Sequence, residues 1–150
     1  MEQLLREMTF GFLGLVRDAR PYVIPLNYAY ADGRILFHCT LAGQKLDAIK
    51  SNPAVCLTVA RQRGSVERHS ENVCHPDSES VVCHGTARVV EDLTERTDVL
   101  NAFHRTFRPD AEPISAESAA NCAAVEIVVK EMTGRREQGR VITRWRYRFS

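Results

Sequence analysis

Apolar and polar residues alternate along much of this chain, which is the pattern of half-buried β-strands. The alternation is clearest at residues 141–149, where aromatic and aliphatic side chains take one set of positions and three arginines most of the other. Asp32-Gly33 is a strong hairpin signal, so the first three strands are expected to form an antiparallel meander. Seven strands are predicted in all, at residues 10–16, 22–30, 34–40, 55–60, 80–90, 123–129 and 141–149.

Helical spacing of apolar residues is confined to a few segments. Asp92 followed by Glu95 is the pattern of a capping box, which opens a helix that runs to about residue 107. Shorter helices are expected at residues 1–8, 45–52 and 115–121. The polar residues 61–79 are predicted to form a long loop, and residues 134–139 a turn. Residues 1–150 are therefore predicted to form a single domain, a small antiparallel β-barrel with helices packed outside.

Composition places the chain among ordinary globular proteins. It has 150 residues, of which 44% are hydrophobic and 26% charged. No apolar run approaches the roughly 20 residues of a membrane helix, and no secretory signal pattern is present, so a cytoplasmic protein is expected. The five cysteines include no Cys-x-x-Cys pair, which favours reduced thiols.

The net charge of +1 hides an uneven distribution. Residues 135–150 contain six arginines and one acid. Nucleic-acid binding would require arginines and stacking aromatic residues on the same strand face, but Trp145 and Tyr147 lie opposite the arginines. We therefore predict no nucleic-acid partner, and a solvated face, a contact with a partner subunit or a contact with a phosphate remain open for the arginines.

The most informative segment is residues 22–53. A predicted strand ends at Thr40, Gly43 follows, and a helix begins near Lys45. Free backbone N–H groups and the helix dipole favour an anion at such a helix start, and Lys45 lies in the first turn, within reach of the same anion. A solvated lysine is the alternative interpretation.

Four segments in this order resemble the pyridoxamine 5′-phosphate oxidase-like FMN-binding split barrels, most closely their nitroimidazole-resistance (Nim-type) branch. They are Tyr22–Tyr28 (YVIPLNY), residues 37–56 with FHC, GQKLD and NPAVC, Val81–Ala87 (VVCHGTA) and Val125–Gly134 (VEIVVKEMTG). The resemblance covers roughly residues 10–134. It departs from the Nim-type pattern at Cys74–Glu79, where a tryptophan and basic residues are usual. That difference argues against a nitroimidazole substrate.

The resemblance implies a mainly β fold with flanking helices, a six- to seven-stranded antiparallel split β-barrel. It also implies a homodimer with FMN, or FAD, in clefts between the subunits, and the apolar strand at residues 141–149 is a second reason to expect a dimer. Carried over by position, the cofactor-binding residues are Pro25, Leu26 and Asn27 at the flavin ring, His38, Cys39 and Thr40 along the ribityl and phosphate path, Lys45 at the phosphate, and Ser80 and Val82 at the ring edge.

His38 has more than one possible role. Catalytic proton donor, metal ligand and modified residue are the chemical options, and hydrogen bonding to the flavin phosphate or the backbone is preferred. A zinc site could draw on the neighbours His38-Cys39, Cys74-His75 and Cys83-His84. Adjacent strand residues point to opposite faces, so each pair offers one ligand at most, and no metal site is predicted.

Three functions fit these observations. The first is an FMN-dependent oxidoreductase that takes electrons from a reduced nicotinamide or another donor and passes them to a small organic acceptor. The second is a non-catalytic flavin- or haem-binding module, and the third is a dimeric scaffold with an empty cleft.

Overall fold

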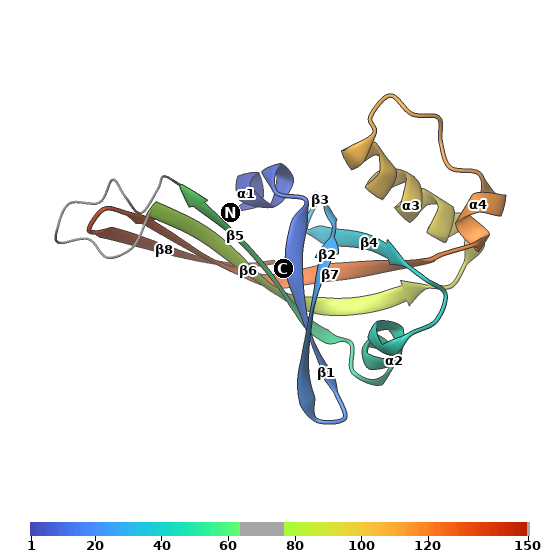
Figure 1. The fold of residues 1–150 in the computed structure, drawn as a ribbon, viewed down its shortest axis with the longest axis horizontal. Coiled ribbons are helices and arrows are strands. Elements are labelled where there is room, and N and C mark those ends of the chain that lie inside the picture. Colours follow the sequence, from blue (N-terminus) through green and yellow to red (C-terminus); the bar gives the residue numbers. More distant parts are fainter. Residues whose placement is uncertain (64–76, 150) are drawn as a thin grey trace.

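In a computed structural model of the chain, residues 1–63 and 77–149 are described, and they form one twisted antiparallel sheet with four helices around it (Figure 1). The strands follow the order β2-β1-β5-β6-β7-β4-β3, and β8 also pairs with β7. This arrangement confirms the predicted mainly β split-barrel fold. The strand bounds are β1 Phe10–Arg17, β2 Arg20–Asn27, β3 Ala29–Ala31, β4 Arg34–Cys39, β5 Ala54–Arg63, β6 Asp77–Val90, β7 Ala123–Gln138 and β8 Val141–Arg148.

The four predicted helices are present, as α1 Glu2–Glu7, α2 Gln44–Ser51, α3 Leu93–Phe107 and α4 Ala116–Ala120. Asp92 caps α3 by accepting a hydrogen bond from the backbone N–H of Glu95, as the capping box predicts. Ser115 caps α4 in the same way through the N–H of Ser118.

Both antiparallel pairings of the predicted meander are present, but its middle strand is interrupted. The segment 22–30 divides at Tyr28, whose backbone N–H bonds to the carbonyl of Thr9 and whose hydroxyl donates to the carbonyl of Leu5. Before this point the chain pairs with β1, and after it β3 pairs with β4 across the Asp32-Gly33 turn. The other neighbour of β4 is β7. Because the segment 22–30 forms two strands, the sheet has eight strands rather than six or seven.

Parts of two predicted irregular segments are strand. β5 continues to Arg63, β6 begins at Asp77, and β7 continues through residues 134–138. Their charged residues face one another across the sheet, with Arg61 opposite Glu79 and Glu79 opposite Arg136, so polar side chains stabilise pairing that a hydrophobic pattern does not indicate. The rest of the predicted loop, residues 64–76, lies outside the described residues.

Apolar residues form two clusters. The larger lies inside the barrel and includes Leu13, Phe37 and Leu57. The smaller lies between the sheet and α3, where Leu36 packs with Phe103. Thus α3 covers the outside of β4, which explains why adjacent residues of β4 face two different environments (Figure 1).

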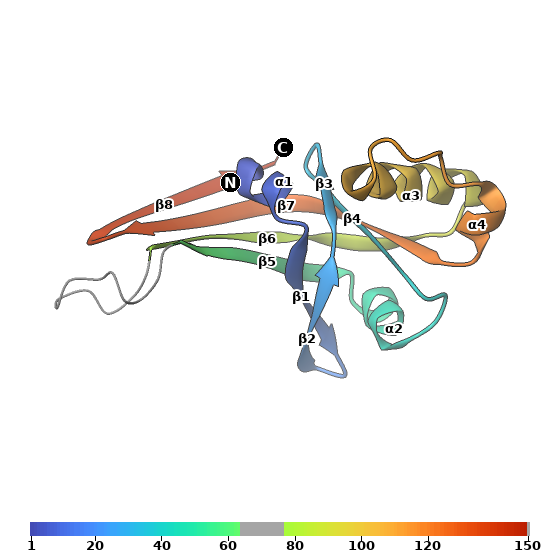
Figure 2. The same ribbon diagram turned by 45° about the horizontal axis from the view of Figure 1, so that its top comes forward.

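Beyond the barrel, four strands continue as a long projection that we call the arm (residues 58–63, 77–84, 131–138 and 141–148; Figure 2). The helix α1 lies beside the arm near the barrel, and α3 and α4 lie at the other end of the molecule. Within the described part of the chain, β8 pairs on one edge only, with β7. No helix in residues 1–63 or 77–149 is long and apolar enough to cross a membrane.

Candidate functional site

The predicted anion site is a cavity of about 210 Å³ at the end of β4. Cys39 and Thr40 line it from the strand end, Gly43 and Lys45 from the turn and first helical residues, and Tyr22 from β2. The structure therefore brings together three of the predicted cofactor-binding residues, Cys39, Thr40 and Lys45. Tyr22 was not predicted, because an aromatic residue in a strand gives no sign of which loop it will face.

The turn into α2 leaves backbone donors at the cavity. Gly43 is the residue before the first turn of α2, and no side chain caps this helix start. Its φ of 139° favours glycine, and a Cβ added there would meet no atom within 4 Å, so the surrounding space is open. The Thr40 hydroxyl closes the turn by donating to the carbonyl of Ala42 at 2.9 Å. The cavity thus combines a helix N-terminus with the ammonium of Lys45.

His38 lies on the other face of β4 from Cys39 and lines a separate cavity of about 430 Å³ beside α3 and α4. Its ring packs edge-on against Phe103, with centroids 4.9 Å apart. Burial, assisted by the charge of Lys45, lowers the pKa of His38. Burial also raises the pKa of the Cys39 thiol. Both groups are therefore held neutral, and the structure does not bring His38 into the cavity of Lys45.

A second surface carries the residues predicted to meet the flavin ring. Cross-strand neighbours place Pro25, Phe12, Thr58 and Val82 in one row across β2, β1, β5 and β6. Three strand spacings make this row about 14 Å long. We call its exposed apolar part, comprising Phe10, Phe12, Val16, Val23 and Pro25, the outer face. The rings of Phe10 and Phe12 pack edge-on at 5.9 Å.

The remaining predicted residues divide between the two sides of the sheet. Asn27 is exposed and pairs with Phe10, and Ser80 pairs with Ala60, so both belong with the row of Pro25 and Val82. Leu26 is different, because its side chain packs against the core inside the barrel. The signal that separates Leu26 from Pro25 and Asn27 is the alternation of strand side chains.

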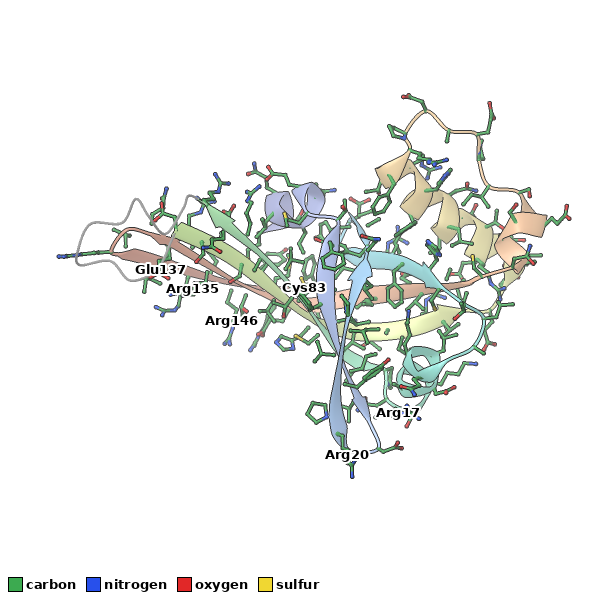
Figure 3. All side chains as sticks on the ribbon, in the orientation of Figure 1. Arg17, Arg20, Cys83, Arg135, Glu137 and Arg146 are labelled. Carbon is green, nitrogen blue, oxygen red and sulfur yellow. The ribbon has the colours of Figure 1, made fainter. Side chains whose placement is uncertain are left out.

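The sequence analysis missed a cluster of charges on the arm. Arg61, Arg63 and Arg136 surround the buried carboxylate of Glu79. Burial alone would raise the pKa of Glu79, but hydrogen bonds from the three arginines outweigh it and hold the pKa at about 2. Figure 3 shows Arg135, Glu137 and Arg146 along the same arm. The two-residue spacing of Arg61 and Arg63 could have signalled one strand face.

Metal-ligating residues do not gather in the described segments. Residues 1–63 and 77–149 contain no group of three or more His, Cys, Asp or Glu side chains that could hold a metal ion. Cys83 is buried, which raises its pKa to about 12 and leaves it a neutral core residue. The pair Cys74-His75 lies outside the described residues.

Comparison with known sequences identifies one family. Residues 1–136 match the family model described as pyridoxamine 5′-phosphate oxidase. A curated protein of Rhizobium meliloti without assigned function is 42% identical over 48 residues, which is 32% of this chain and 31% of that protein. The match thus spans about a third of the relative.

Solved structures with the same fold include three informative neighbours. A proposed 5-nitroimidazole antibiotic resistance protein from Bacteroides thetaiotaomicron is 26% identical, with a TM-score of 0.77 over 89% of this chain and 80% of that one. An FAD-binding protein from Mesorhizobium loti is 23% identical, with a TM-score of 0.70 over 91% and 92%. The flavocytochrome Anf3 from Azotobacter vinelandii is 18% identical, with a TM-score of 0.77 over 99% and 77%.

Proposed function

The chain belongs to the pyridoxamine 5′-phosphate oxidase family, and from that membership we propose that it is a flavin-binding oxidoreductase. In this proposal the flavin is FMN or FAD, electrons come from a reduced nicotinamide or another donor, and the acceptor is a small organic molecule. The observation that carries the proposal is the cavity at Lys45, where a cation and an uncapped helix N-terminus converge. A flavin phosphate is the anion that such a cavity suits.

In this proposal, different residues bind the two ends of the flavin. The phosphate is bound by Lys45, Thr40 and the first backbone N–H groups of α2. The flavin ring packs against the row of residues from Pro25 to Val82. When bound, the flavin supplies the electron transfer itself. The neutral imidazole of His38 lies outside the phosphate cavity, which favours a packing role beside Phe103 over proton donation.

The outer face supports a homodimer as part of this proposal. Phe10, Phe12 and Val23 are about half exposed or more, which is unusual for clustered apolar side chains of a monomer. Packing this face against a second copy would bury it and leave the flavin between the subunits.

We expect the purified protein to carry a flavin. Lys45→Ala should weaken flavin binding by about ten- to a hundredfold, because the variant loses a hydrogen bond between charged groups. Lys50→Ala is the matched control, because Lys50 lies in the last turn of α2 and does not line the cavity. Flavin absorbance after equilibrium dialysis measures the affinities. His38→Ala should change the affinity much less than Lys45→Ala. Equal flavin retention in the two lysine variants would reject the phosphate cavity.

Turnover is tested on the same samples. Bleaching of the bound flavin by NADH or NADPH, with recovery of the colour in air, is expected for the oxidoreductase. A protein that stays yellow with every nicotinamide would be a non-catalytic flavin-binding module. A Soret band would identify haem instead, which the name of the flavocytochrome neighbour makes a specific alternative.

The dimer is predicted to bury more than about 2,000 Å² in total, which is the range of obligate interfaces. Phe12→Asp should convert the dimer to monomer, because it places a charge in the middle of the outer face. Light scattering at micromolar concentration measures the mass. Leu41→Asp is the control, an exposed apolar residue beyond the end of β4 and off the outer face. A monomeric unmodified protein would contradict the prediction.

A further inference from the structure

A third cavity, of about 190 Å³, lies between α1 and the arm. Met1 and Leu4 line it from the helix, and Trp145 lines it from β8. Its polar lining consists mainly of the arginine cluster around Glu79. These features combine an aromatic ring with several guanidinium groups in a space of small-molecule size.

The arginine cluster has more donors than acceptors. One oxygen of Glu79, Oε1, accepts hydrogen bonds from Nε and Nη2 of both Arg61 and Arg63. The other oxygen, Oε2, accepts from Nε and Nη2 of Arg136, at 3.3 and 3.0 Å. A carboxylate offers about four lone-pair sites, so these six contacts oversubscribe it. Another acceptor would therefore relieve the cluster rather than compete with it.

Two of the arginines retain donors that such an acceptor could use. Arg61 is fully engaged, because its Nη1 donates to Glu7 at 2.7 Å. The Nη1 groups of Arg63 and Arg136 make no hydrogen bond to any residue in 1–63 or 77–149. Their side chains are 58% and 51% exposed, so both arginines are open to solvent.

The surrounding charges are already committed to other partners. Arg135 at the cavity rim is paired with Glu137. Asp77 accepts a hydrogen bond from the backbone N–H of Gly139 at 2.7 Å. Among the described residues, the unused donors of Arg63 and Arg136 thus remain for an incoming anion.

Trp145 gives the cavity a flat wall. The guanidinium of Arg136 lies 5.9 Å from the centre of the indole ring, and Trp145 is 44% exposed. A cavity of 150 Å³ is large enough for benzene, so one of about 190 Å³ suits a single aromatic ring with a charged substituent. We propose that this cavity binds a small aromatic acid, whose carboxylate is held by Arg63 and Arg136 and whose ring lies against Trp145.

This site uses different side chains from the proposed flavin site, except for Ser80, which borders the cavity and was predicted at the flavin ring edge. Glu79 and Val81 face the cavity side of β6, whereas Val82 belongs to the row on the opposite face of the sheet. Arg61 and Ala60 alternate in the same way on β5. The inference therefore does not depend on flavin binding, and a failure of one proposal leaves the other intact.

Trp145 is the only tryptophan of the chain, so intrinsic fluorescence reports on this cavity alone. Benzoate is the probe, titrated into the purified full chain with the emission excited at the red edge of tryptophan absorption. We expect a saturable change in emission, and calorimetry should give the same dissociation constant. Neutral benzamide has the same shape and should bind at least about tenfold more weakly, because it lacks the charge.

Arg136→Lys keeps the charge and the fold but loses the planar fork, so it should weaken benzoate binding at least about tenfold. Arg63→Gln should have a similar effect. Arg146→Lys is the matched control, because Arg146 is next to Trp145 but on the other face of β8, where it pairs with Glu131. The proposal is overturned by the absence of a saturable change up to about 10 mM benzoate, by equal binding of benzamide, or by equal losses in the Arg136 and Arg146 variants.

Discussion

Gly85→Ala should lower the free energy of unfolding by about 3 kcal/mol, the upper part of the range for overpacking a core. A Cβ at this position would lie 2.4 Å from the carbonyl oxygen of Val128 and 2.9 Å from Cγ2 of Ile127. The register between β6 and β7 shifts at this residue, so the two backbones approach closely and neither can retreat without breaking the ladder. Urea denaturation measures the change.

Gly14→Ala is the control for that experiment. A Cβ at Gly14 would lie 3.4 Å from the carbonyl oxygen of Cys56, which is an ordinary contact. Gly14 is also within a strand, so both substitutions change the entropy of the unfolded chain in the same way. Equal destabilisation by the two substitutions would show that close backbone approach is not what requires glycine at position 85.

Glu79→Gln should destabilise the protein by about 3 kcal/mol, because three guanidinium groups lose the carboxylate they share. The pKa of Glu79 is about 2 in the folded protein, below the ordinary value of 4.5. Its stabilising effect is therefore fully present above about pH 4.5 and is lost as the pH falls toward 2. Denaturation across this pH range should show a dependence that is weaker in the variant.

Glu131→Gln provides the comparison. Glu131 also forms ion pairs with two arginines, Arg146 and Arg148, but its side chain is more exposed than that of Glu79. Ion pairs open to solvent contribute about 0–1 kcal/mol. A loss as large as that of Glu79→Gln would mean that burial does not decide the strength of these pairs.

Local signals in the sequence were sufficient to predict most individual helices, strands and turns. The hairpin at Asp32-Gly33 and the helix N-cap at Asp92 depend on residues close together in the chain, and both are confirmed. The cavity at Lys45 is also local, because Thr40, Gly43 and Lys45 lie within six residues. Such features follow from backbone conformation and need no knowledge of the tertiary fold.

Pairing between distant strands could not be predicted in the same way. The break at Tyr28 depends on its hydroxyl reaching the carbonyl of Leu5, which is a tertiary contact. The extension of β5 and β6 into a polar segment depends on Arg61 meeting Glu79, eighteen residues along the chain. His38 was predicted to lie on the phosphate path because of its neighbours in sequence. In the structure its ring packs against Phe103 of α3, a helix that is remote in sequence.

The outer edge of β8 has a consequence for solubility at high concentration. Within residues 1–63 and 77–149 no strand pairs with this edge, so its backbone groups are a template on which another copy could add a strand, the step that starts edge-to-edge aggregation. Arg144, Arg146 and Arg148 share one face of this strand. Any register that aligns these faces in two copies sets guanidinium opposite guanidinium, which is repulsive. The arginines of β8 thus oppose edge-to-edge aggregation of a strand that also carries exposed aromatic residues. This repulsion should weaken as added salt screens the charges.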